Sequence, residues 1–399
     1  MTTKITWDPA DNANYDRRIR SIVTHYTVLD EDASRDVLKH GGVGAHYLIP
    51  KERKEDGTDV WQFVKDTDRA WDAGISHWQA RDGLNDTSLG IEIVGYGYGL
   101  AQESKDILWP YQVEDEISTL LTAEIKKDQK FYQLLVDHDL LKAFLADMQR
   151  SLVPPLKRED YKKYVLEAEI TKYRAVTKDL REKHDPFSKI SQADLYDLEK
   201  EGKLIWDEYT EHQRATLVSL IKQLCEDLKI KEGDTTCYEI SPTAIIGHSD
   251  IAPGRKVDPG PKFPWKYLYE QGIGAWPDEE QVSAIKSKIG TVQEIDIAWV
   301  QDNLRCFGYQ VKTTKTLDEQ TQNAVRSFQM HFEPDNYSGS PSINTVSILA
   351  ALIKKYFPKD YNPYPVHSLA SSSGFFDVTT PISPADNSSP GILSCCKIC

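Results

Sequence analysis

The segment Arg20-Ser-Ile-Val-Thr-His-Tyr-Thr-Val28 predicts a buried strand in the N-terminal region, because it is an apolar run rich in β-branched residues. Three similar runs follow at 44–49, 60–64 and 88–94, and a helical pattern at 32–39 separates the first two runs. Strands that alternate with helices are typical of α/β domains. We therefore predict an α/β fold with a mixed β-sheet flanked by helices.

The amino-acid composition of the chain changes after this region. Residues from about 100 to 203 are rich in Glu, Lys, Leu and Tyr, and their apolar residues recur at helical spacing, which predicts a helical insertion in the first domain. Further along, three helical patterns predict a small all-α domain. The expected parts of the chain are a first domain at 1–276 that carries the insertion, a linker at 277–291, the three-helix domain at 292–357, and a disordered, Ser- and Pro-rich tail at 358–399.

The composition excludes several classes of protein. The 399 residues include 48 Lys and Arg against 62 Asp and Glu, a formal net charge of −14. Because such a field repels nucleic acids and anionic membranes, we expect no nucleic-acid partner. No apolar stretch approaches the roughly 20 residues that span a bilayer, and the N-terminus lacks the apolar region of a secretory signal. The six cysteines do not form the spacing pattern of a disulfide framework.

Histidines at strand ends are the first candidates for chemistry. His25 and His248 each lie in or at the end of a predicted strand, where the sites of α/β sheets are commonly assembled. His248 belongs to the proline-stiffened segment Gly247-His-Ser-Asp-Ile-Ala-Pro-Gly-Arg-Lys-Val-Asp-Pro-Gly-Pro261. Two imidazoles and one carboxylate suit a catalytic zinc ion, with a fourth position left for water. The spacing alone leaves both Asp250 and Asp258 open as the carboxylate ligand.

A charged residue inside an apolar strand is the second unusual feature. Glu92 lies in Leu89-Gly-Ile-Glu-Ile-Val94, a run that otherwise has the character of a buried strand. One interpretation is an outward-facing residue on a half-exposed strand, which the two-residue alternation of strands allows. The other is a carboxylate that takes a proton from a metal-activated water and delivers it again.

Several ordered motifs share a resemblance. They are Thr24-His-Tyr-Thr27, Ala45-His-Tyr-Leu48, Ala70-Trp-Asp-Ala-Gly-Ile-Ser76, Leu84-Asn-Asp-Thr-Ser-Leu-Gly-Ile-Glu92, and His248-Ser-Asp-Ile-Ala-Pro253 with Phe263-Pro-Trp265. In this set the chain resembles the type-2 family of zinc-dependent N-acetylmuramoyl-L-alanine amidases, whose AmiD-type members it is similar to outside the insertion. The resemblance implies hydrolysis of the amide bond between N-acetylmuramic or anhydro-muramic acid and L-alanine of peptidoglycan stem peptides.

The same resemblance implies roles for single residues. His25, His248 and Asp258 match the zinc ligands of the family, so Zn²⁺ is the expected cofactor. Glu92 matches the general base and acid, and Lys256 matches the cation that stabilises the oxyanion. The further candidates, for contacts with the substrate, are His46, Asp72, Asn85 and Arg255. Asp72 departs from the pattern, since many relatives have a histidine there; another departure lies near Gly95, where many relatives have an asparagine.

The remaining parts carry weaker expectations. The region 292–357 resembles the three-helix peptidoglycan-binding module, which implies tethering to peptidoglycan or a muropeptide. The insertion is interpreted either as a decoration packed beside the cleft or as a lid or docking element for a protein partner. An alternative function from another class is a non-catalytic peptidoglycan or muropeptide recognition protein. We expect a monomer.

The end of the chain gives an expectation about location. Cys396-Lys-Ile-Cys399 loosely fits a prenylation motif, with Cys395 as a candidate for a second lipid. The other interpretation is an exposed tail. With no N-terminal signal, the chain is expected to be cytoplasmic or exported by a route other than Sec. A lipid anchor would fit a bacterial effector that associates with the membranes of a host cell.

Overall fold

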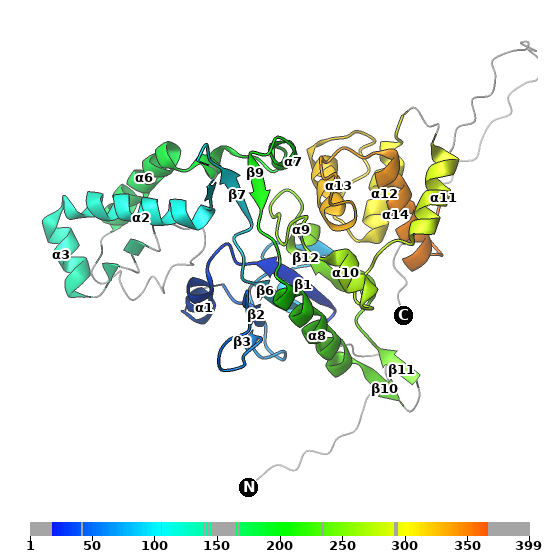
Figure 1. The fold of residues 1–399 in the computed structure, drawn as a ribbon, viewed down its shortest axis with the longest axis horizontal. Coiled ribbons are helices and arrows are strands. Elements are labelled where there is room, and N and C mark those ends of the chain that lie inside the picture. The colour runs from blue at the N-terminus through cyan, green and yellow to red at the C-terminus, as the bar shows by residue number, and fades with distance from the viewer. Residues whose placement is uncertain are drawn as a thin grey trace, which may run out of the picture.

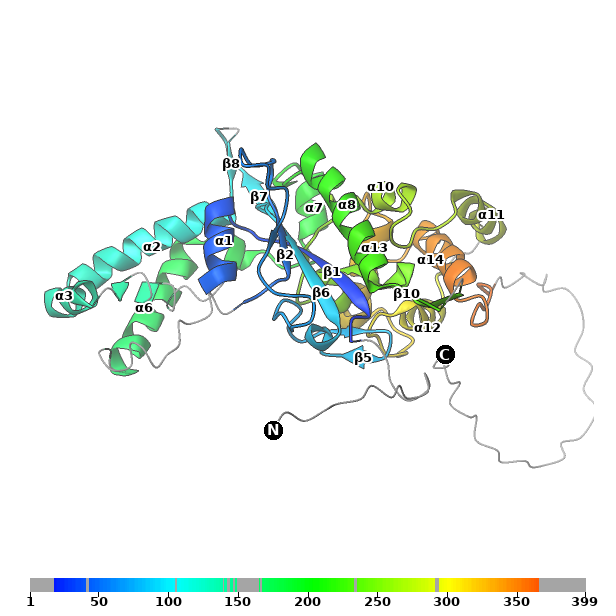
Figure 2. The same cartoon turned by 90° about the horizontal axis from the view of Figure 1, so that it is seen from below.

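The structure is a computed structural model. It describes residues 18–40, 43–104, 106–138, 140–141, 144–145, 148, 165, 167–232, 235–290 and 294–365. In both views a central sheet lies between two helical regions, with the insertion at one end of the molecule and the C-terminal helices at the other (Figures 1 and 2). No helix in these ranges is long and apolar enough to cross a membrane.

The central sheet is mixed, as predicted. Its strand order is β12-β1-β6-β2-β3, in which the first four strands are parallel and β3 pairs antiparallel with β2. The strands are β1 (Ser21–Tyr26), β2 (Tyr47–Ile49), β3 (Trp61–Gln62), β6 (Ser88–Ile93) and β12 (Ile245–Gly247). Their burial explains the sequence pattern, because parallel strands covered on both faces read as continuous apolar runs. The same burial means that a polar residue in these strands needs a specific role.

Two helices flank this sheet. Helix α1 (Glu31–His40) connects β1 to the region before β2, and α8 (Glu211–Leu228) runs beside the sheet (Figure 2). Thr210 and Gln213 form a capping box at the start of α8, which satisfies backbone donors that the first helical turn leaves free. The apolar stripe of α8 is buried in the main core, and it consists of Leu217, Leu220, Ile221 and Leu224.

The insertion is helical, as predicted, but it also contains strands that the sequence pattern did not reveal. Its helices are α2 (Pro110–Lys126), α3 (Gln129–Asp137), α6 (Glu167–His184), η3 (Pro186–Lys189) and α7 (Leu195–Lys200). A three-stranded sheet of order β8-β7-β9 closes its base, formed by β7 (Tyr98–Ala101), β8 (Ile107–Leu108) and β9 (Leu204–Trp206). Strands of two to four residues are too short to show an alternating pattern.

A separate apolar core lies inside the insertion. It is built around stacked and edge-to-face rings of Phe131, Phe144 and Tyr173, together with Leu121 and Leu135. This cluster is distinct from the main core under the central sheet. The outer part of the insertion therefore has its own packed interior.

Short elements complete the first domain. They are β4 (His77–Trp78), β5 (Arg81–Asp82), η2 (Leu84–Asp86), the hairpin of β10 (Ile230–Glu232) and β11 (Thr235–Tyr238), η4 (Pro242–Ala244), α9 (His248–Ile251) and α10 (Trp265–Glu270). The proline-stiffened segment after β12 begins with the one-turn helix α9.

The C-terminal region contains the three predicted helices. They are α12 (Ile297–Phe307), α13 (Glu319–Phe332) and α14 (Ile343–Tyr356). The expected linker at 277–291 is largely helical, because α11 (Glu279–Ile289) occupies it and packs along α14. Buried residues of these helices belong to the same core cluster as the central sheet. Most of the predicted tail, including the cysteines near its end, lies outside the described residues.

Candidate active site

Three adjacent parallel strands bring the main candidate residues to one edge of the sheet. His25 lies near the end of β1, Glu92 near the end of β6, and His248 directly follows β12. Because β12, β1 and β6 run in the same direction, their carboxyl ends meet at the same edge, where ligands of α/β sheets bind. Residues separated by 223 positions thereby become neighbours.

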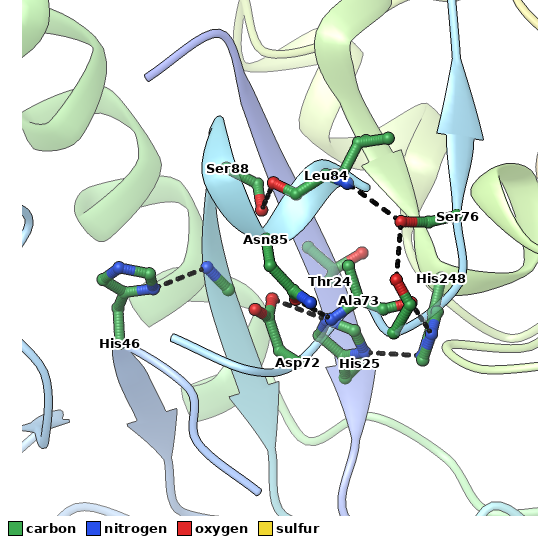
Figure 3. Close-up of polar contacts among 12 residues, drawn as sticks. Thr24, His25, His46, Asp72, Ala73, Ser76, Leu84, Asn85, Ser88 and His248 are labelled. Carbon is green, nitrogen blue, oxygen red and sulfur yellow. Dashed lines mark hydrogen bonds and ion pairs between the residues drawn. The ribbon is translucent and has the colours of Figure 1, made fainter. Parts of the chain in front are cut away.

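The three proposed metal ligands form a tight triangle. Nδ1 of His25 lies 3.0 Å from Nδ1 of His248, and each of these nitrogens lies 3.0 Å from Oδ2 of Asp258. The two imidazole rings meet edge to face (Figure 3). A zinc ion with ligands at about 2.0–2.1 Å separates tetrahedral ligand atoms by about 3.3 Å. Among the described residues this is the one group of His, Cys, Asp and Glu with metal-binding spacing.

The outer nitrogens of both imidazoles are already engaged. Nε2 of His248 lies 3.1 Å from the carbonyl oxygen of Ala73, and Nε2 of His25 lies 3.3 Å from Oδ2 of Asp72. Since a carbonyl and a carboxylate are acceptors, these contacts place a hydrogen on each Nε2 and leave a lone pair on each neutral Nδ1. Nη2 of Arg255, which is a donor, also lies 3.3 Å from Nε2 of His248. Two lone pairs and a carboxylate oxygen that converge at 3.0 Å fit a cation between them. The residues present therefore fit a zinc ion.

The charges in this cluster favour a bound cation. Burial opposes a charge on His25, but Glu92, Asp258 and Asp72 outweigh it and raise the pKa of His25 to about 10. Burial also opposes ionisation of Asp258, yet His248 and His25 hold the pKa of Asp258 well below its usual range. Without a metal ion, a proton on His25 takes the place of the missing positive charge.

Glu92 faces the same edge as His25, and its outward-facing interpretation is wrong. Its Oε2 is buried, and no described residue offers it a hydrogen bond. Burial, together with the negative charges of Asp258 and Asp72, raises the pKa of Glu92 to about 7, against the opposing effect of His25 and Lys256. A carboxylate with a pKa near neutrality is suited to accept and return a proton.

Lys256 and the two aspartates of its loop have different surroundings. Lys256 is half-buried, and its positive charge acts on both Glu92 and His248. Asp258 joins the histidine cluster, whereas Asp250 points to the C-terminal helices and bonds with Tyr309 and His331. The structure therefore places Asp258, and not Asp250, beside the two imidazoles of the candidate metal site.

Asp72 contacts the outer nitrogen of His25, one of the candidate metal ligands. Its side chain is 1% exposed, with Oδ2 toward His25, while Oδ1 has no hydrogen-bond partner in the described part of the chain. The carboxylate lies against Gly90 so closely that a Cβ at that position would be 2.0 Å from Oδ2. The absence of a side chain at Gly90 in β6 is thus what leaves room for the carboxylate. Sequence reasoning put Asp72 beside a substrate, and the structure puts it beside His25.

His46 is unavailable to a substrate, contrary to the prediction. It is fully buried, its Nδ1 accepts from the backbone N–H of Gly90 at 3.0 Å, and its Nε2 lies 3.2 Å from the carbonyl oxygen of Asp68. Burial lowers its pKa. His46 therefore joins the strand β6 to the segment that leads to Asp72.

Asn85 and Arg255 hold the loop that carries Asp72. Oδ1 of Asn85 accepts from the N–H of Ala73 at 2.8 Å, and Asn85 is buried, so its role is also structural (Figure 3). Arg255 is exposed, and its Nη2 donates to the carbonyl oxygens of Ala73 and Ile75 at 2.9 and 2.6 Å. Trp71 and Ile75 of the same loop are large apolar residues that are exposed.

Sequence reasoning missed the partners that come from the C-terminal helices. Neither His331 nor Tyr309 is among the candidate site residues of the sequence analysis. Both bond to Asp250, which is two residues from His248. The available signal was the polar Asp250 in a segment otherwise suited to burial, which required a partner from elsewhere.

Comparison with known proteins follows the same division of the chain. The sequence profile of the N-acetylmuramoyl-L-alanine amidase family matches residues 15–148 and 170–261, and a peptidoglycan binding domain profile matches 293–349. N-acetylmuramoyl-L-alanine amidase AmiD of Escherichia coli K12 is 29% identical over 341 residues, which cover 85% of this chain and 84% of AmiD.

Solved structures of amidases are similar over most of the chain. AmiD of E. coli, in complex with the substrate anhydro-N-acetylmuramic acid-L-Ala-D-γ-Glu-L-Lys, gives a TM-score of 0.55 at 26% identity and covers 87% of this chain and 93% of its own. AmpDh3 of Pseudomonas aeruginosa, in complex with an anhydromuramic pentapeptide, gives a TM-score of 0.56 at 28% identity. The match covers 89% of this chain and 99% of AmpDh3.

Proposed function

This chain belongs to the N-acetylmuramoyl-L-alanine amidase family, and from that premise we propose that it is a zinc enzyme that cleaves the muramoyl–L-alanine bond with the side chains described above. The proposed ligands are His25, His248 and Asp258. Glu92 is the proposed general base and acid, and Lys256 the oxyanion-stabilising cation.

One observation carries the zinc assignment. Nδ1 of His25, Nδ1 of His248 and Oδ2 of Asp258 lie 3.0 Å from one another, and both outer ring nitrogens already donate to acceptors. Acceptor atoms that face each other this closely repel unless a cation or a proton lies between them. The set of two nitrogens and one oxygen matches catalytic zinc sites, which keep a fourth position open.

The residues around the ligands supply the rest of the chemistry. Bound zinc supplies Lewis acidity and makes water a nucleophile near neutral pH. Glu92 accepts a proton from the attacking water and donates it to the amine nitrogen of L-alanine when the C–N bond breaks. Lys256 offsets the negative charge that develops on the carbonyl oxygen. The products are a lactyl carboxylate and a free stem peptide.

Relatives support a muropeptide as the substrate. The AmiD and AmpDh3 structures contain anhydromuramic peptides, and the match to a peptidoglycan binding domain indicates a second contact with the same polymer. A binding domain next to a catalytic domain raises the local concentration of substrate without taking part in the chemistry.

The test compares zinc-loaded protein with chelator-treated protein on a purified anhydromuropeptide. Mass spectrometry of the products is expected to find free stem peptide, formed only by the zinc-loaded protein. A non-catalytic recognition protein would bind the muropeptide and leave it intact. Intact muropeptide after incubation with protein of full zinc content would contradict the proposed reaction.

A further inference from the structure

The loop that carries two proposed zinc ligands is attached to the C-terminal helices through one buried carboxylate. We call residues 247–258 the metal-site loop. Asp250 in this loop is 1% exposed. Its Oδ2 accepts from the backbone N–H of Gly247 and from Nδ1 of His331, both at 2.8 Å, and its Oδ1 accepts from the hydroxyl of Tyr309 at 2.6 Å. Two of these three donors belong to the C-terminal region.

Both side-chain donors have fixed positions of their own. Tyr309 is fully buried and lies edge to face with Trp78 of the first domain. The imidazole of His331 stacks on Trp265, with ring centroids 3.7 Å apart. Rings packed on several sides have one available rotamer, so they hold the atoms they bond to in one place.

The Asp250 carboxylate links the fixed positions of Tyr309 and His331 to the proposed ligand His248. Asp250 accepts a hydrogen bond from the backbone N–H of Gly247, and Gly247 is the residue directly before His248. The N–H of Ser249 in turn donates to the carbonyl oxygen of Asp258 at 2.7 Å, which joins the two ligand positions of the loop. Tyr309 and His331 therefore act on His248 through two successive hydrogen bonds. The first joins each of them to Asp250, and the second joins Asp250 to Gly247, the residue before His248.

A second contact joins the same helix to the loop. Gly254 has φ +76°, and a Cβ at this position would be 2.4 Å from Nδ2 of Asn323 in α13. Helix α13 therefore touches the metal-site loop at Gly254 as well as at Asp250. The loop therefore contacts helix α13 at two separate positions.

We propose that the C-terminal region is part of the scaffold of the metal site, in addition to any binding of peptidoglycan. In this proposal, which rests on the proposed zinc site, Tyr309 and His331 are positioning residues that orient His248 through Asp250. The competing view is that the same bonds stabilise only the contact between domains. The two views differ in what happens to zinc affinity when one bond is removed.

The chain offers a matched pair of variants for the test. Tyr309→Phe and Tyr337→Phe each remove one hydroxyl from a fully buried tyrosine of the C-terminal region. The Tyr309 hydroxyl bonds with Asp250, whereas the Tyr337 hydroxyl accepts from Nε1 of Trp206 at 2.9 Å and donates to the Glu199 carboxylate, so its hydrogen bonds go to residues outside the metal-site loop. Both variants are made in the full-length chain.

The measurement is the zinc dissociation constant by competition with a chromophoric chelator, with the visible spectrum of the cobalt-substituted protein and the melting temperature recorded alongside. Tyr309→Phe is expected to weaken zinc binding about tenfold and to shift the cobalt spectrum, as for other residues behind metal ligands. Tyr337→Phe is expected to lower the melting temperature to a similar degree and to leave both metal readouts unchanged. His331→Gln serves if Tyr309→Phe does not fold, with the same expected loss.

Two results would overturn the proposal alone. They are a Tyr309→Phe protein with the zinc affinity and cobalt spectrum of the wild type, and equal losses in both tyrosine variants. A wild-type protein that binds no zinc would overturn the proposed function itself, so the two failures are distinguishable. A double-mutant cycle adds a further check, because Asp250→Asn and Tyr309→Phe are expected to be non-additive.

Discussion

His25 and Glu92 are register partners on the adjacent parallel strands β1 and β6. Residues paired in this way point to the same face of a sheet, so a histidine that can hold a metal ion and a carboxylate that can move a proton are neighbours by the geometry of the strands. Asp72 completes the arrangement on the far side of the His25 ring. These relations lead to the following predictions.

Glu92→Gln is expected to lower kcat by about 10²–10⁴-fold, because it removes proton transfer in both directions. Zinc content should stay at the wild-type level, since Glu92 is not among the three ligands. The exposed Glu55→Gln is the matched control and should keep full activity. Turnover within a few-fold of the wild type in Glu92→Gln would show that another group is the base.

The same substitution is expected to stabilise the metal-free protein at alkaline pH. The folded-state pKa of Glu92 is raised from 4.5 to about 7, so the free energy of unfolding falls as the pH rises from about 4.5 to 7 and stays at the lower level above pH 7. Glutamine avoids this cost, for a gain of about 1–3 kcal/mol at pH 8 that vanishes below about pH 4.5. Urea unfolding of both proteins at the two pH values, in the presence of chelator, measures the difference.

Zinc binding is expected to release about one proton near pH 7. In the metal-free protein the pKa of His25 is raised to about 10, so this ring is protonated at neutral pH and must lose its proton to become a ligand. Zinc affinity should therefore rise about tenfold per pH unit between pH 6 and 8. Titration calorimetry in buffers of different ionisation enthalpy gives the proton count. No proton release would mean that His25 is not protonated at this pH in the metal-free protein.

Asp72→Asn is expected to weaken zinc binding about 10–100-fold, because an amide holds the outer nitrogen of His25 less strongly than a carboxylate does. The matched control is Asp82→Asn on β5, whose side chain is 83% exposed. Chelator competition measures both variants. Unchanged affinity in Asp72→Asn would contradict the role of Asp72 behind His25 and would return it to the set of substrate contacts.

Removal of the outer insertion tests whether it restricts access. Nδ1 of His184 lies 3.2 Å from Oε1 of Glu116, so residues 117–183 can be replaced by a short Gly-Ser linker between neighbouring positions. This deletion removes the separate core of the insertion and keeps β8, α7 and β9. If the insertion is a lid, hydrolysis of intact sacculi should rise several-fold relative to that of soluble fragments. Unchanged activity on both substrates would make the insertion a decoration.

The sequence predicts the parts of the fold that depend on local pattern. The buried strand around His25 is apolar enough to be recognised from the sequence. The apolar residues of α8 recur at helical spacing, so this helix can be recognised as well. The strands β7 and β9 are too short to show a period, and they pair because the chain returns after about 100 residues. Helix α11 falls in the predicted linker because it lies between two predicted domains.

Some residues of the candidate site can be predicted from sequence motifs, and others depend on contacts between distant segments. His25, His248 and Asp258 match motifs, and the structure places them together. The position of Asp72 depends on the absence of a side chain at Gly90, which becomes visible only when the strands are placed. The bond from Tyr309 to Asp250 joins residues 59 positions apart in different domains, and no local pattern encodes such a contact.

The most direct test of the zinc site is X-ray absorption at the zinc edge of protein purified without chelator. We predict one zinc ion per chain with two imidazole nitrogens and oxygen ligands at about 2.0–2.1 Å, and loss of the ion in a His25→Ala, His248→Ala double variant. A sulfur shell at about 2.3 Å, which the six cysteines of the chain could supply, or a protein free of zinc would contradict the account.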